Sequence, residues 1–144
     1  MSGDRQPALR IGDWAALGPA AAQVRTEVFV REQGIPAELE WDADDRLCLH
    51  CVAFDGDEPV ATGRLLPDGH IGRMAVLAGW RRSGLGGAIL ERLVDAAREH
   101  GHVQAMLNAQ RYVEAFYERH GFQTVGQPFQ EAGIEHVAMR RALR

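Results

Sequence analysis

The sequence predicts an α/β fold with a mixed sheet: a central, mostly antiparallel sheet, one parallel β-α-β unit, and helices on both faces. Three observations predict it. A helical segment follows the first strand, three strand-like segments separated by tight turns come next, and the remainder alternates between helices and strands. Tight turns join antiparallel neighbours, whereas a strand–helix–strand crossover joins parallel ones. The 144 residues suit a single domain, predicted to span residues 1–144.

The first half of the chain is predicted to hold one strand, one long helical segment and then three strands. Residues 8–11 form the first strand, and residues 14–33 carry the helical spacing of apolar side chains. Pro19 interrupts that segment and suits the first turn of a helix. Gly34 and Pro36 end it. The three strands are expected at residues 47–54, 59–66 and 70–77.

The second half is predicted to alternate between helices and strands. Apolar residues recur every fourth position from Leu85, opposite a charged face, which indicates an amphipathic helix ending at Gly101. A second helix is expected to end at Gly121. The strands of this half are expected at residues 103–107, 122–126 and 136–140.

The overall charge and hydropathy exclude some classes of partner. The formal net charge is −4 and the sequence pI is about 5.8, which disfavours a dedicated nucleic-acid binder. No window approaches the eighteen or so apolar residues of a membrane span. Residues 1–10 lack the apolar core of a signal peptide. The expectation is a cytoplasmic protein, monomeric or homodimeric, with neither nucleic acid nor membrane as partner.

Two local features are interpreted as structural. Cys48 and Cys51 are the only cysteines, and zinc would need two further ligands at comparable spacing, so reduced thiols and no metal site are expected. On a strand, residues three apart point to opposite faces, which would separate the two sulfur atoms. The acidic run at residues 38–45 is interpreted as a solvated loop rather than a cation-binding rim.

The segment from Arg81 to Gly87 carries the strongest chemical signal. Three glycines, Gly84, Gly86 and Gly87, leave the start of a helix free of side chains. The first N–H groups of a helix and its dipole then form an anion site suited to a diphosphate. The P-loop and dinucleotide fingerprints do not match, because neither lysine nor a third glycine stands at the required positions. The alternative is a glycine-rich turn that only packs a helix against a sheet.

Two motifs together resemble the GNAT superfamily of N-acetyltransferases. Arg81-x-x-Gly84-x-Gly86 matches its coenzyme A loop, and residues 116–122 read Phe-Tyr-x-x-x-Gly-Phe, as the family often does at this distance. The resemblance covers roughly residues 8–142. Residues 28–33, 71–76 and 133–136 resemble the ElaA/YjcF-like bacterial branch.

The resemblance implies an N-acyltransferase that moves an acetyl group from acetyl-CoA to a primary amine by direct attack. It implies that the Val76 N–H stabilises the oxyanion and that Tyr117 donates a proton to the departing thiolate, with Tyr112 as a weaker alternative. The implied cofactor-binding residues are Met74, Ala75, Val76, Arg81, Arg82, Ser83, Gly84, Leu85, Gly86, Gly87, Asn108, Gln110 and Tyr117.

The chain departs from the family pattern at two places. Gln110 stands where many members have asparagine seven residues before the tyrosine, with Asn108 two positions earlier, and either amide can serve. Arg73 stands where many members carry a glutamate base. The missing glutamate motivates an alternative function, a non-catalytic acyl-CoA-binding or sensing domain. The candidates for the base are Glu27, Glu32, Asp42, Asp45 and His136.

Overall fold

The computed structural model describes residues 6–143 and contains two antiparallel sheets. The first has the order β1-β2-β3-β4, formed by Ala8–Gly12, Leu49–Asp55, Glu58–Leu65 and Ile71–Val76. The second has the order β5-β7-β6, formed by Gln104–Gln110, Ile134–Ala142 and Gln123–Glu131. The helices are α1 (Trp14–Arg25), α2 (Ala37–Glu40), α3 (Leu85–Glu99) and α4 (Glu114–Arg119), and α1 continues as a π-helix over Thr26–Glu32.

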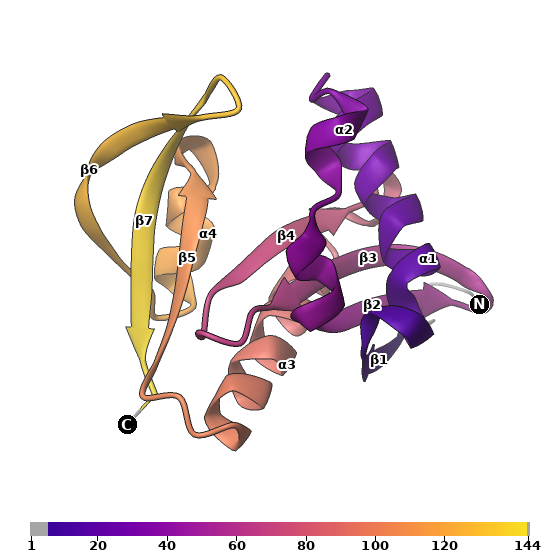
Figure 1. Cartoon of the computed structure of the whole chain (residues 1–144), viewed down its shortest axis with the longest axis horizontal. Helices are drawn as coiled ribbons and strands as arrows, with labels where there is room; N and C mark the ends of the chain where they lie inside the picture. The colour runs from indigo at the N-terminus through magenta and orange to yellow at the C-terminus, as the bar shows by residue number, and fades with distance from the viewer. Residues whose placement is uncertain (1–5, 144) are drawn as a thin grey trace.

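The two sheets meet between β4 and β5. A parallel bridge pairs His70 with Met106, and the Met106 N–H donates to the Gly69 carbonyl at 3.1 Å. From this point the two strands diverge toward their C-terminal ends (Figure 1). The predicted parallel β-α-β unit is therefore present as β4-α3-β5, and its two strands separate instead of continuing as neighbours.

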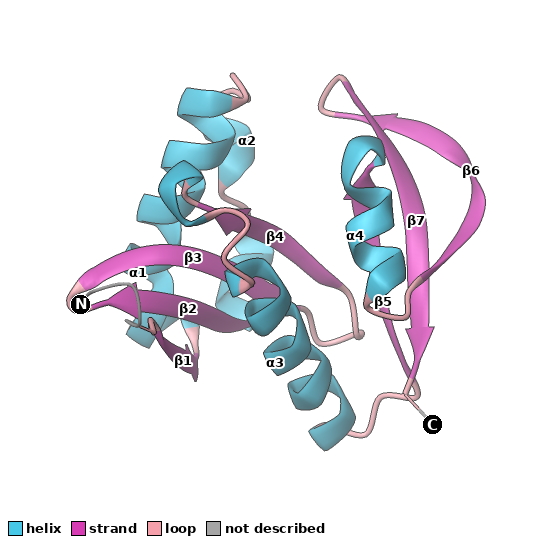
Figure 2. Cartoon of the chain, turned by 180° about the vertical axis from the view of Figure 1, so that it is seen from behind, coloured by secondary structure: helices cyan, strands magenta, loops and turns pink. Residues whose placement is uncertain are grey.

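Helices cover both faces of the sheets, as predicted. The helices α1 and α2 lie on one side, and α3 and α4 lie on the other (Figures 1 and 2). The apolar face of α3 is fully buried at Ile89, Leu90 and Leu93. Burying one such side chain contributes roughly 1.5–3 kcal/mol. A larger residue at Gly63 on β3 would displace core side chains, because a β-carbon there would lie 2.6 Å from Met74 Sδ and 2.9 Å from Leu93 Cδ1.

Pro19 lies inside α1 instead of starting a helix, so this prediction is wrong. The helix begins earlier because the Asp13 carboxylate caps it, accepting a hydrogen bond from the Ala16 N–H at 2.9 Å. The Trp14 side chain then covers Gly18, where a β-carbon would lie 2.7 Å from the indole. Pro19 has no N–H to donate, so α1 lacks one helical hydrogen bond at this point. The Asp13 cap and the packing of Trp14 compensate for that loss.

The acidic run is not simply a solvated loop: Glu38 and Asp44 are exposed, but Glu40 and Asp45 are buried, which corrects the second local prediction. It forms α2 and a 3₁₀ turn over Ala43–Leu47, and the Asp45 side chain is completely buried. Arg25 and Arg64 each donate to the Asp45 carboxylate, at 2.9 and 2.8 Å. Two buried arginines need opposite charges close by, and the acidic run supplies them.

The remaining differences lie at element boundaries. The hairpin of β6 and β7 is longer than predicted, and its irregular register between Val125 and Phe129 curves β6 away from β7.

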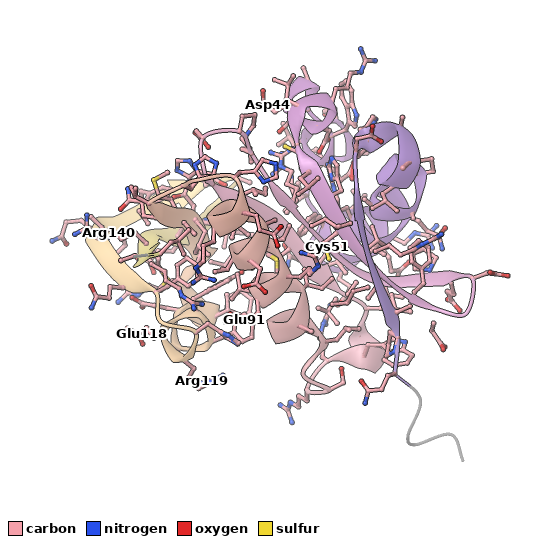
Figure 3. The ribbon with its side chains drawn as sticks, turned by 90° about the horizontal axis from the view of Figure 1, so that it is seen from below. Asp44, Cys51, Glu91, Glu118, Arg119 and Arg140 are labelled. Atoms are coloured by element: carbon pink, nitrogen blue, oxygen red, sulfur yellow. The ribbon has the colours of Figure 1, made fainter. Side chains whose placement is uncertain are left out.

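The two cysteines lie in different places. Cys48 precedes β2 instead of lying in it, and its thiol donates to the Asp44 carbonyl at 3.2 Å. Both cysteines are free and buried, and burial raises the pKa of each thiol to about 11. Figure 3 shows Cys51 in the interior beside α3.

Candidate functional site

A β-bulge shapes β4 just before its C-terminal end. Arg73 and Met74 of β4 together oppose the single residue Gly63 of β3. Arg73 has φ of +50°, an uncommon conformation for a residue other than glycine. Beyond the bulge, the Ala75 side chain is buried against α1, whereas Met74 packs toward the core around α3. A bulge of this kind bends its strand and increases the local twist.

The backbone of Val76 points away from β3. The Leu77 N–H donates to the Val60 carbonyl at 3.0 Å, and hydrogen-bonded pairs alternate along an antiparallel ladder. The pair of Val76 with Ala61 is therefore a non-hydrogen-bonded one, so the Val76 N–H and C=O face the side of β5. In agreement, the Val76 carbonyl accepts a hydrogen bond at 3.0 Å from Arg81 Nε.

The loop after β4 leads into the N-terminus of the 15-residue helix α3. Gly84 caps the helix with φ of +85°, and a β-carbon there would have nothing within 4 Å. The first helical hydrogen bond is donated by the Ala88 N–H to the Gly84 carbonyl, so the N–H groups of Gly86 and Gly87 precede it. Three glycines in four positions, with backbone N–H groups that precede the first helical hydrogen bond, favour an anion at this point.

Ser83 and Arg82 complete the loop after β4. The Ser83 hydroxyl donates to the Trp80 carbonyl and accepts a hydrogen bond from the Leu85 N–H at 3.4 Å. The Arg82 backbone has φ of +63° and its side chain is exposed. The loop is thus folded by its own hydrogen bonds, with a cationic side chain facing solvent.

Arg81 makes a bidentate ion pair with Glu32, the last residue of the π-helix. Its Nη2 and Nη1 atoms lie 2.7 and 2.9 Å from the two carboxylate oxygens. The hydrogen bonds to Glu32 raise the pKa of the Arg81 guanidinium above its usual value. The cationic loop and the first helical segment are therefore joined directly.

Tyr117 lies on α4 with 8% of its side chain exposed. It packs edge-on against Phe116 and Phe122, with ring centroids at 5.0 and 6.1 Å. Burial raises the pKa of its hydroxyl to about 12, so the phenol stays protonated at neutral pH and can donate a proton. Tyr112, by contrast, is 73% exposed. The Phe116 ring lies between Tyr117 and the loop, because a β-carbon built on Gly86 would lie 3.7 Å from the Phe116 ring.

The two amides predicted on β5 share one face of the strand. Asn108 is exposed, and Gln110 Nε2 donates to Gln33 Oε1 at 3.1 Å. Gln33 follows the π-helix directly; it belongs to the segment 28–33 that resembles the ElaA/YjcF-like branch, but nothing in the sequence assigned it a role in the site. Leu107 and Ala109 are buried on the opposite face of β5, in the core that contains α3. Gln110 therefore contacts the end of the first helical segment, whereas Asn108 faces solvent.

Two of the five candidate bases are bound to buried arginines. Burial acts to raise the pKa of Asp45, but hydrogen bonds from Arg25 and Arg64 outweigh it and hold that pKa at about 2. The hydrogen bond from Arg64 lowers the pKa of Asp42, which also binds Arg73 at 3.0 Å. Carboxylates stabilised in their charged form are weak proton acceptors.

The three other candidates differ in what they contact. Glu27 is paired with Arg31 at 3.6 Å on the exposed side of the π-helix. His136 is buried in the β6–β7 hairpin, where its Nδ1–H donates to the Ile134 carbonyl at 2.7 Å. Glu32, through Arg81, is the candidate joined to the loop.

Within residues 6–143, no three or more His, Cys, Asp or Glu side chains are grouped so that they could hold a metal ion. No helix in that range combines the length and apolarity needed to cross a membrane.

Comparison with known proteins identifies the family of this chain. The family model of the acetyltransferase (GNAT) domain matches residues 18–143. The chain is 40% identical to an uncharacterised N-acetyltransferase, YjcF of Bacillus subtilis (strain 168), over 125 residues, which are 84% of this chain and 89% of YjcF.

Solved structures share the fold over nearly the whole chain. An acyl-CoA N-acyltransferase from Pseudomonas aeruginosa superposes with a TM-score of 0.85 at 34% identity, covering 94% of this chain and 99% of that one. Escherichia coli ElaA superposes with a TM-score of 0.85 at 26% identity, with the same coverage of 94% and 99%. This chain therefore belongs to the GNAT superfamily of acetyltransferases, in the branch that contains ElaA and YjcF.

Proposed function

We propose that this protein transfers an acetyl group from acetyl-CoA to a primary amine, which attacks the thioester directly. One observation carries the proposal: the Val76 backbone N–H faces the space between β4 and β5, beside a helix start built of glycines. Membership of the family supports N-acyltransferase activity with a CoA-based cosubstrate. The acetyl donor, the amine acceptor and a cytoplasmic location are proposals from the sequence.

The loop and the edge of β4 would hold the two parts of the donor. The N–H groups from Gly84 to Gly87, with Ser83 and Leu85 folding the loop, would bind the diphosphate, and Arg81 and Arg82 would add charge. The residues fit this ligand, because the space that a Gly84 side chain would fill is open. The edge from Met74 through Ala75 to Val76 would pair with the pantetheine amides, and Asn108 or Gln110 would contact them from β5.

Val76 and Tyr117 would then carry the chemistry of the donor side. The Val76 N–H would bind the negative charge that develops on the thioester oxygen, an effect often worth a few kcal/mol. As the carbon–sulfur bond breaks, the Tyr117 hydroxyl would donate its proton to sulfur. An ordinary thiol has a pKa of about 8.5, so this transfer is uphill from a phenol in water. Apolar surroundings raise the pKa of Tyr117 and that of a thiol bound beside it in the same direction, so burial acts on both partners of the transfer.

A panel of amines with detection of the released thiol tests the proposal. The panel should include a polyamine, free lysine, an amino sugar and a peptide with a free N-terminus. Acetyl-CoA should raise the melting temperature of the protein, and at least one amine should accelerate CoA release. Stabilisation by acetyl-CoA without CoA release would favour the non-catalytic acyl-CoA-binding domain, for which Arg73 at the usual base position is the motivating observation.

A further inference from the structure

Two consecutive residues join the end of the first helical segment to both diverging strands. The Glu32 carboxylate binds Arg81 in the loop after β4, at 2.7 and 2.9 Å. The neighbouring Gln33 accepts a hydrogen bond at 3.1 Å from Gln110, the last residue of β5. The helix end therefore spans the opening between the C-terminal ends of β4 and β5, where the proposed function places the thioester.

Within this arrangement, Glu32 lies close to the proposed oxyanion donor. Arg81 Nε binds the Val76 carbonyl while its two Nη atoms bind Glu32, so a single guanidinium separates the carboxylate from the Val76 backbone. The Val76 N–H and C=O leave the strand on the same side. The Glu32 side chain, 33% exposed, thus lies one guanidinium away from the proposed oxyanion donor and is partly open to solvent.

We propose that Glu32 is the catalytic residue that accepts the proton of the attacking amine, and that donor binding frees it by drawing Arg81 away. This inference rests on the proposed function. The amine nitrogen forms a bond to the acyl carbon and the carbon–sulfur bond breaks. The proton leaving the amine passes to the Glu32 carboxylate, and the proton of Tyr117 passes to sulfur, so charge and atoms balance.

Arg81 couples donor binding to the release of Glu32, because the donor would compete for both the Arg81 guanidinium and the Val76 carbonyl that it binds. The diphosphate would attract its guanidinium, and a pantetheine N–H would use the Val76 carbonyl that Arg81 Nε now occupies. The guanidinium is 44% exposed and can turn without disturbing the core. Surface ion pairs typically shift an equilibrium by about fivefold or less, and the bidentate geometry puts this pair at the strong end of that range, within reach of competition from a doubly charged diphosphate. The donor must then bind before the acceptor can react.

The variant Glu32→Gln tests both halves of the proposal. Removing the competing charge should tighten binding of CoA, measured by calorimetry, by about two- to fivefold. Removing the proton acceptor should lower kcat with the best amine of the panel by about 100-fold or more. Glu32→Asp should recover part of the lost kcat. Glu27→Gln is the matched comparison, since it removes a carboxylate from the same π-helix and serves as the rival base.

The possible outcomes separate failure of this inference from failure of the proposed function. If the wild-type protein turns over and Glu32→Gln retains its kcat, or if Glu27→Gln alone is slow, the inference fails and the function stands. If Glu32→Gln binds CoA more weakly, Glu32 only supports the loop and the inference fails as well. If the wild-type protein does not bind CoA, the proposed function itself fails. If it binds CoA but turns over none of the amines, the transferase function and the catalytic role of Glu32 both fail, and calorimetry on Glu32→Gln decides only whether Glu32 competes for Arg81.

Discussion

The edge of the His120 imidazole lies against the position that a β-carbon on Gly87 would take. A β-carbon built there would be 3.0 Å from both Cε1 and Nε2 of the ring. The ring is held in place because its Nδ1–H donates to Glu91 at 2.8 Å, and Arg141 binds the same carboxylate at 3.1 Å. The first turn of α3, the end of α4 and strand β7 are thereby fastened together next to the proposed diphosphate site.

Gly87→Ala should destabilise the protein. Overpacking costs about 1–3 kcal/mol, whereas alanine in place of glycine gains up to about 1 kcal/mol in helix propensity. We expect a net loss of about 1 kcal/mol in urea denaturation. In a His120→Ala background the clash is absent, and the same change should stabilise the helix. Equal effects in the two backgrounds would show that the imidazole does not limit this position.

Gly84→Asp should weaken CoA binding by about tenfold or more, because it places a negative charge at the diphosphate position. Calorimetric titration with CoA measures the effect. Gly84→Asn is the control, since asparagine tolerates the positive φ of this residue and adds a side chain of similar size without charge. If both variants lose affinity equally, the side chain matters and the charge does not. Unchanged affinity in the aspartate variant would refute the loop assignment.

Tyr117→Phe should lower kcat by about 100-fold and leave the affinity for CoA within about twofold, because only the proton donor is removed. The ring contacts with Phe116 and Phe122 remain, so the melting temperature should change little. Tyr112→Phe, at an exposed position, is the matched control. A wild-type rate for Tyr117→Phe would leave this residue with a packing role only.

Asp45 should make stability depend on pH in the acid range. Its pKa in the folded protein is about 2, below the ordinary value of 3.8, so its contribution is complete above pH 4 and is lost as the pH falls toward 2. Asp45→Asn leaves Arg25 and Arg64 short of a buried charge, which costs about 3–5 kcal/mol.

Acid titration of the melting temperature in parallel with urea denaturation at pH 7 checks this prediction. The neighbouring exposed residue Asp44, which Figure 3 shows at the surface, supplies the control variant Asp44→Asn. The Asp45 variant should lose much of the decline below pH 4 that the wild-type protein shows. Identical acid transitions for the wild type and Asp45→Asn would contradict the assignment.

Cys48 and Cys51 should be unreactive in the folded protein. Burial raises the pKa of both thiols to about 11, so almost no thiolate exists at pH 7. A chromogenic disulfide reagent should react with them only after unfolding. Cys48→Ala combined with Cys51→Ala should retain kcat within about twofold, although losing two buried side chains lowers stability. Rapid labelling of native protein would indicate that these sulfurs are more accessible than their packing suggests.

The elements that follow a regular pattern were predictable from the sequence. Helix α3 has an apolar residue at each turn from Leu85 and a glycine after its end, and the structure confirms it over Leu85–Glu99. The order of strands and helices is also confirmed. The extent of β6 was not predictable, because this strand is exposed along almost its whole length and carries no alternation of apolar and polar residues.

Features that depend on distant partners escaped prediction. The burial of Asp45 follows from Arg25 and Arg64, which lie 20 and 19 positions away in the sequence. An acidic run looks the same in sequence whether it faces water or buried arginines. The contacts of Glu32 with Arg81 and of Gln33 with Gln110 likewise span 49 and 77 positions. The loop motif and Tyr117 remain predictions as site residues, which the variants above can test.

The bulge at Arg73 also bears on the solubility of this protein. The Val76 N–H and C=O point away from β3, so this end of β4 has the character of an edge strand, which can template pairing with another chain. The left-handed backbone at Arg73 interrupts the regular spacing of hydrogen-bonding groups, and Arg81 covers the Val76 carbonyl. Both features make the edge a poor match for a foreign strand. A variant that straightened β4 would expose a regular strand edge that favours self-association.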